Sequence, residues 1–150
     1  IGLLPMPPDH AAVESGPLPG LLGTERGLLV AGPMDPDDRG VAAVAELSRR
    51  TGWPVLADPA SGLRRGPQTA DAPVLASGDH LLRSTWANDR RPDLVVQMGA
   101  MPTSKGYRLW LDRVGTGRLV AVDHLGRFPD PPHRVTDRVA DIRDAIVLSP

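Results

Sequence analysis

The chain has 150 residues, 41% of them hydrophobic and 23% charged, which is typical of one globular domain and not of a disordered segment. Its formal net charge of −1 argues against binding nucleic acid or an anionic membrane surface through bulk electrostatics. The absence of cysteine excludes disulfides, thiolate metal sites and a cysteine nucleophile, and no apolar run approaches the roughly 20 residues of a spanning helix.

Residues 1–25 are rich in proline and glycine and show neither a helical nor a strand period. Five prolines in this stretch forbid a long helix, so we expect an extended interdomain linker followed by a folded domain over residues 26–150. The sequence starts at Ile1 without the charged flank and apolar stretch of a signal peptide. We therefore expect a trimmed polypeptide from the cytoplasm.

From residue 26 onward, predicted strands and helices alternate. The apolar run 27–32, closed by Gly32 and Pro33, predicts a strand buried on both faces. A helix follows between the acidic residues at 35–38 and Gly52. Further strands are predicted at 54–58, weakly at 73–76, at 93–98 and at 119–123, with a loose alternation over 134–140; further helices are predicted at 79–87, 104–113 and 141–148.

This alternation predicts βαβ units, and hence an α/β fold: a Rossmann-like, doubly wound, mainly parallel sheet with helices on both faces. Such crossovers place the loops that follow the strands on one edge of the sheet, where ligands usually bind. We therefore expect residues 32–33, 58–61, 99–105 and 123–127 to gather at that edge.

Several common site motifs are missing. The first strand is followed by Gly32-Pro33-Met34-Asp35-Pro36 and not by the glycine-rich turn that lets a backbone approach a pyrophosphate, and no P-loop lysine follows a strand. The spacing of the histidines does not support a zinc site, and the surroundings of Ser61 are not those of a nucleophile elbow. The four histidines are His10, His80, His124 and His133.

The segment 99–105 is the most informative for function. Ser104 is placed to cap a helix that begins at Lys105, the only lysine in a chain with 16 arginines. An ammonium group beside unpaired backbone N–H groups would suit a carboxylate, whereas the alternative is a solvated surface lysine. Nearby arginines could extend a basic surface along this edge or form ordinary interdomain salt bridges; they are Arg64, Arg65 and Arg127.

An ordered set of segments points to a family. The segments are 26–32, then 52–59 with Ser61 and Arg64, then 92–96, 99–105 with 109–111, and finally 122–123, 126–127 and 130–131. Together they resemble the middle domain of the 2-succinyl-5-enolpyruvyl-6-hydroxy-3-cyclohexene-1-carboxylate synthases, the MenD family of thiamine-diphosphate enzymes. The resemblance covers about residues 26–148.

The resemblance implies a three-domain parent whose outer domains bind thiamine diphosphate and Mg²⁺. Such a parent is a transferase of menaquinone biosynthesis that decarboxylates 2-oxoglutarate and adds the succinyl unit to isochorismate, and we expect it to be a homo-oligomer. The middle domain in this family binds no nucleotide and lends basic side chains to the substrate pocket. We therefore expect no catalytic, cofactor-binding or metal-binding residue in this chain, and no activity from the domain alone.

The resemblance also assigns candidate substrate-binding residues. Lys105 matches the lysine of the family's M-P-x-S-K turn, in which Ser104 precedes it, and Ser61 and Arg64 match its S-x-x-R motif. The chain departs from some members at Gly106, where they carry an arginine. Three alternatives remain open: a purely structural or oligomerisation module, a domain of a different thiamine enzyme such as an acetohydroxyacid synthase relative, and a free-standing Rossmann-like ligand-binding domain.

Overall fold

The computed structural model describes residues 22–34, 38–123 and 134–143. Residues 1–21 of the predicted linker, most of the predicted helix 141–148, Arg127 and three of the four histidines lie outside these ranges. The strands are β1 (Gly27–Ala31), β2 (Val55–Ala57), β3 (Val74–Leu75), β4 (Leu94–Met98), β5 (Arg118–Val122) and β6 (Asp137–Val139). The α-helices are α1 (Asp38–Thr51), α2 (Gly78–Arg83) and α3 (Lys105–Val114).

The described strands form one sheet in the order β3-β2-β1-β4-β5-β6, and every neighbouring pair is parallel. This is the strand order of the doubly wound Rossmann fold, in which the chain reverses its direction of growth between β1 and β4. The predicted fold class is therefore confirmed, including the short strand at 73–76. The loose alternation over 134–140 contains the edge strand β6.

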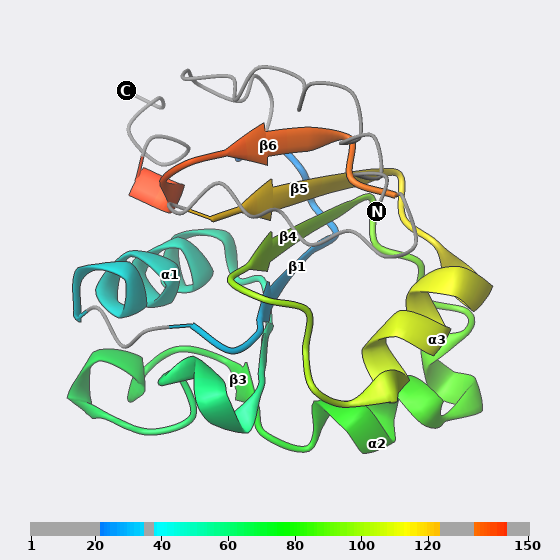
Figure 1. Ribbon diagram of the computed structural model, residues 1–150, viewed down its shortest axis with the longest axis horizontal. Helices are drawn as coiled ribbons and strands as arrows, with labels where there is room; N and C mark the ends of the chain where they lie inside the picture. The colour runs from blue at the N-terminus through cyan, green and yellow to red at the C-terminus, as the bar shows by residue number, and fades with distance from the viewer. Residues whose placement is uncertain (1–21, 35–37, 124–133, 144–150) are drawn as a thin grey trace, which may run out of the picture.

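Helices cover both faces of the sheet, as the sequence predicts (Figure 1). Successive residues of β1 alternate between the two apolar layers because side chains of a strand point to opposite faces. Leu29 packs in the layer that contains α1 residues such as Leu47. Leu28 packs in the opposite layer, together with Leu82 of α2 and Trp110 of α3.

The predicted helix 79–87 is divided in the structure. Helix α2 ends at Arg83, and a separate 3₁₀ turn, η3, covers Thr85–Ala87. Ser84 has extended backbone angles, and its hydroxyl donates to the Leu81 carbonyl oxygen at 2.6 Å, which closes the helix. The indole of Trp110 donates to the Ala87 carbonyl oxygen at 3.2 Å and holds η3 against α3. A local hydrogen bond therefore closes the helix, and a contact distant in sequence positions the turn that follows it.

Gly27, at the start of β1, gives a test of this packing. A Cβ atom there would collide with the ring of Trp53, whose side chain is buried and whose Nε1 donates to the Thr24 carbonyl oxygen at 3.1 Å. Gly27→Ala should therefore lower the free energy of unfolding by about 1–3 kcal/mol, the usual cost of overpacking a core. Urea unfolding followed by circular dichroism measures this loss.

Ala42→Ser is the matched control, because it also adds one heavy atom but does so at an exposed position of α1. Equal unfolding midpoints for Gly27→Ala and the unmodified chain would show that Trp53 does not pack against β1 as described.

Candidate functional site

The strand order reverses between β1 and β4, and the loops that follow these two strands fill the crevice at this point. The Gly32 amide donates to the Met98 carbonyl oxygen at 3.0 Å, and the Ala100 amide donates to the Pro33 carbonyl oxygen at 2.9 Å. A Cβ atom on Gly32 would collide with the carbonyl oxygen of Ala100, so the two loops are in direct backbone contact. Rossmann proteins bind dinucleotides at this point, whereas here the loops after β1 and β4 fill it.

Asp58 connects the loop after β2 to the loop after β4. Its Oδ2 accepts hydrogen bonds from the Thr103 amide at 2.8 Å and the Thr103 hydroxyl at 2.7 Å. Its Oδ1 accepts from the Ala60 amide at 2.9 Å, which caps the short η1 helix (Pro59–Ser61). Only 6% of Asp58 is exposed. The predicted gathering of these loops at one edge is therefore confirmed, and a buried carboxylate joins them.

The surroundings of Asp58 favour its charged form. Burial by itself raises the pKa of the carboxyl group, but the hydrogen bonds from Ala60 and Thr103, together with the charge of Arg64, outweigh burial and lower the pKa below its ordinary value. The carboxylate therefore stays ionised in the folded chain and can accept all three hydrogen bonds.

Ser104 joins the start of α3 to α2. Its hydroxyl oxygen accepts from the Gly106 amide at 3.2 Å, which confirms the predicted N-cap, and its hydroxyl donates to Oδ1 of Asp79. This hydrogen bond is the largest cause of the lowered pKa of Asp79; burial opposes it, and the paired Arg83 adds to it. A Cβ atom on Gly106 would collide with Asp79. Glycine at 106 thus permits this contact between α2 and α3.

A hollow of about 150 Å³ opens between these loops and helices. Arg64 and Ser104 both line it, so the structure brings together two of the four predicted substrate-binding residues. Nε of Arg64 donates to the Ala57 carbonyl oxygen at 2.9 Å, which orients the guanidinium group. The two lining carboxylates, Asp58 and Asp79, are already hydrogen-bonded. The Ser104 hydroxyl donates its proton to Asp79, so the hollow offers the Arg64 guanidinium group to a small anionic group.

The other two predicted residues lie differently. Ser61 is fully buried, with its hydroxyl donating to the Asp58 carbonyl oxygen at 2.7 Å and accepting from the Leu63 amide at 3.2 Å. Lys105 is exposed at the first turn of α3 and forms no ion pair with any residue in the described ranges. Substrate contact by all four residues remains a prediction.

Sequence reasoning missed the residues that organise this edge, Asp58, Asp79 and Thr103. Asp58 is the last residue of the predicted strand 54–58, and a carboxylate at the end of a strand can accept hydrogen bonds from neighbouring loops. Its partner lies 45 residues further along the chain, and no local pattern indicates that distance.

The described residues contain no group of three histidine or acidic side chains placed to hold a metal ion. Among the helices in the same ranges, none combines the length and apolar character needed to cross a membrane.

These features define a Rossmann-like α/β domain in which loops fill the crevice at the reversal of strand order and a hollow lined in part by charged side chains lies beside it. The chain belongs to the family described as the middle domain of thiamine pyrophosphate, whose family pattern matches residues 18–147. The resemblance found in the sequence is therefore confirmed.

Curated relatives carry the name 2-succinyl-5-enolpyruvyl-6-hydroxy-3-cyclohexene-1-carboxylate synthase. The protein from Halorubrum lacusprofundi is 40% identical over 129 residues, covering 79% of this chain and 21% of the relative. The protein from Geobacillus kaustophilus is 46% identical over 113 residues, covering 74% and 19%. That from Listeria monocytogenes is 34% identical over 116 residues, covering 77% and 20%. The chain thus spans about a fifth of the length of these relatives.

Asp58→Asn tests the bridge between the loops. The amide cannot accept all three hydrogen bonds, so the variant should lose about 1–3 kcal/mol of unfolding free energy at neutral pH. The pKa of Asp58 is lower in the folded than in the unfolded chain, so its stabilisation is present above about pH 4 and is lost as the pH falls through the folded pKa. The gap between variant and unmodified chain should therefore narrow below about pH 4.

Urea unfolding between pH 3 and pH 7 measures this difference. Thr103→Val removes the hydroxyl but keeps the amide donor, so it should cost less than Asp58→Asn, and the exposed Asp71→Asn serves as the control for charge. A gap that does not change with pH would show that Asp58 is not held in its ionised form.

Proposed function

We propose that the chain is the middle domain of a cytoplasmic, thiamine-diphosphate-dependent transferase of menaquinone biosynthesis. The parent decarboxylates 2-oxoglutarate and adds the succinyl unit to isochorismate, with residues 1–25 acting as the linker and 26–150 as the domain. Support comes from the family match and from relatives that carry the synthase name across most of this chain's length.

The domain's role in this proposal is to position substrate. The observation that carries it is the bridge from Asp58 to Thr103, because it fixes the turn that leads into Ser104 and Lys105. Arg64 lies in the same hollow as Ser104. A substrate carboxylate would receive charge-assisted hydrogen bonds from Arg64 and Lys105, which restrict its orientation before reaction.

Thiamine diphosphate and Mg²⁺ belong to the parent's other domains in this proposal. The described residues do not fit either group: they hold no metal-binding cluster, and their backbone fills the crevice at the reversal of strand order. In this proposal the parent's other domains supply the chemistry of both groups, and we expect the domain by itself to be inactive.

A structural or oligomerisation role is the second candidate. The complete burial of Ser61 within its own turn favours it, because one of the four family-matched positions is used for internal packing. The two roles predict different results when Lys105 is replaced, since a spacer module does not need an exposed cation there.

Lys105→Ala in the full-length enzyme should lower kcat/KM for one of the two carboxylate substrates by at least about 10-fold, which corresponds to losing roughly 1.4 kcal/mol of binding in the transition state. Steady-state kinetics with each substrate varied in turn measure this. The folded structure should tolerate the change, because removing a cation from a helix N-terminus relieves an unfavourable dipole interaction.

Two further variants separate charge from structure. Lys105→Arg keeps a cation at the same place and should retain part of the activity, whereas Arg108→Ala removes an exposed cation from the same helix and should have no effect. Unchanged kinetics for Lys105→Ala with both substrates would remove Lys105 from the site and favour the structural role.

The mass of the native gene product decides between a domain of a larger enzyme and a free-standing binding protein. An antibody raised against this chain should detect a polypeptide several times larger than 16.0 kDa in extracts of the source cells. A product near 16.0 kDa would contradict the proposal.

A further inference from the structure

A second and larger pocket lies on the face of the sheet that α2 and α3 cover. Its volume is about 340 Å³, and it reaches the amino ends of the strands, where Gly27 begins β1 and Pro54 and Pro92 precede β2 and β4. The hollow beside Asp58 lies toward the opposite edge of the sheet, and only Leu56 lines both. The pocket is therefore separate from the proposed substrate site.

The walls of this pocket are mainly apolar. They include two tryptophans and a group of leucines: Trp86, Trp110, Leu28, Leu56, Leu75, Leu81 and Leu82. Half of Trp86 is exposed, although Trp110 behind it is buried. A concave apolar surface of this volume is in the range of small-molecule sites, and exposing it to water is unfavourable unless a ligand covers it.

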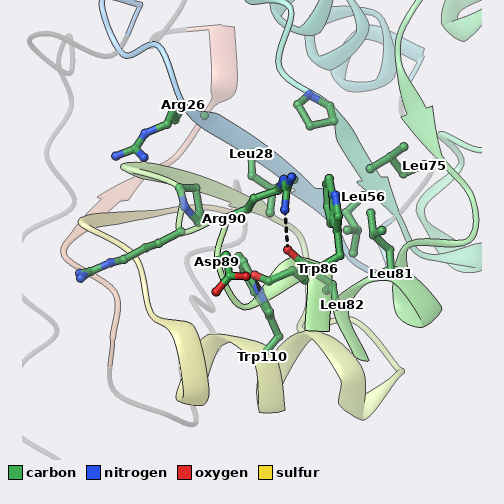
Figure 2. Close-up of a pocket in the computed structure, with 15 residues that line it drawn as sticks. Arg26, Leu28, Leu56, Leu75, Leu81, Leu82, Trp86, Asp89, Arg90 and Trp110 are labelled. Carbon is green, nitrogen blue, oxygen red and sulfur yellow. Dashed lines mark hydrogen bonds between the residues drawn. The ribbon is translucent and has the colours of Figure 1, made fainter. Parts of the chain in front are cut away.

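Arg90 supplies a positively charged group at the same pocket. Its guanidinium carbon lies 4.1 Å from the centre of the Trp86 ring, and its Nη1 donates to the Trp86 carbonyl oxygen at 3.0 Å. Stacking and the hydrogen bond hold the guanidinium group in place against the ring (Figure 2). Its Nε and Nη2 donors have no partner among the described residues.

The neighbouring arginines of the pocket are engaged elsewhere. Arg26 forms a two-pronged ion pair with Asp93, with distances of 2.7 and 2.9 Å, and Arg91 donates to the Thr116 carbonyl oxygen at 3.0 Å. No carboxylate within the described ranges pairs with Arg90, and this includes the adjacent Asp89. Arg91, like Arg90, makes a single hydrogen bond to a backbone carbonyl, but Arg90 is the arginine that is stacked on the Trp86 ring of the pocket wall.

We propose that this pocket binds a small anionic molecule with an apolar, ring-containing body, such as an aromatic carboxylate or sulfonate. The body would pack against Leu28, Leu56 and the Trp86 ring, and the anion would accept hydrogen bonds from the two unused donors of Arg90. Trp86 gives the apolar contact area and also orients Arg90. The Trp86 ring would therefore recognise the apolar body of the ligand, and the Arg90 guanidinium group would recognise its anion.

The fluorescent aromatic sulfonate 1-anilinonaphthalene-8-sulfonate is a suitable probe. Titrated into the 150-residue chain, it should bind at one saturable site, measured by its fluorescence and by calorimetry. Arg90→Gln should weaken this binding by at least about 10-fold, as expected for losing a charge-assisted interaction, and Trp86→Ala should weaken it similarly. Arg90→Lys should retain part of the affinity because it keeps the charge.

An uncharged probe of similar shape, N-phenyl-1-naphthylamine, separates charge recognition from apolar binding. It should bind more weakly than the sulfonate and be unaffected by Arg90→Gln. Matched controls are Arg108→Gln, an exposed arginine outside the pocket, and Leu109→Ala, whose side chain is the other large exposed apolar group of the described residues. Neither control should change the binding of either probe.

Three outcomes would overturn the proposal. They are the absence of saturable binding, an equal loss with Arg108→Gln and Arg90→Gln, and equal binding of the charged and uncharged probes. Thermal unfolding of every variant, followed by circular dichroism, accompanies the titrations. If Arg90→Gln lowers the unfolding midpoint, charge recognition is tested instead by comparing the affinity of Arg90→Lys for the sulfonate with that of the unmodified chain. A complete loss of binding in Arg90→Lys would count against charge recognition.

Discussion

Two loops that are far apart in the sequence meet on one buried carboxylate. Asp58 directly follows β2 and accepts three hydrogen bonds, two of them from Thr103 in the loop after β4. Because these bonds fix the turn before α3, they also fix where Ser104 caps that helix and where Lys105 begins it. The geometry of this part of the carboxyl edge therefore depends on a carboxylate whose pKa burial alone would raise.

The same edge shows how one strand order can lose its usual ligand site. Close backbone contact between the loops after β1 and β4, made possible by Gly32, fills the crevice that dinucleotides occupy in Rossmann proteins. The open hollow lies instead between the loops after β2 and β4, beside Arg64. The strand order is the same as in Rossmann proteins. The hollow has a different position because the backbones of the loops after β1 and β4 are in contact.

The two edges of the sheet also differ in chemical character. Charged side chains, those of Asp58, Arg64 and Asp79, line part of the hollow beside Asp58, whereas leucines and tryptophans dominate the pocket beside Trp86. Helices α2 and α3 contribute to both. The hydrogen bond from Ser104 to Asp79 joins the start of α3 to α2, and the hydrogen bond from Trp110 to Ala87 joins α3 to η3. A change in the packing of these helices would therefore alter both surfaces.

The sequence by itself determined the fold class, the order of the strands along the chain and the capping of α3 by Ser104. These depend on apolar runs, periodicity and turn residues, all of which act over a few neighbouring positions. Only the tertiary structure decided that the predicted helix 79–87 breaks at Ser84, that Ser61 is buried inside its turn and that Asp58 joins two loops. The bridge made by Asp58 depends on contacts between residues far apart in the chain, whose energies local patterns do not contain. Ser61 and Ser84 form short-range hydrogen bonds to the backbone, which compete with regular secondary structure and which the apolar period does not indicate.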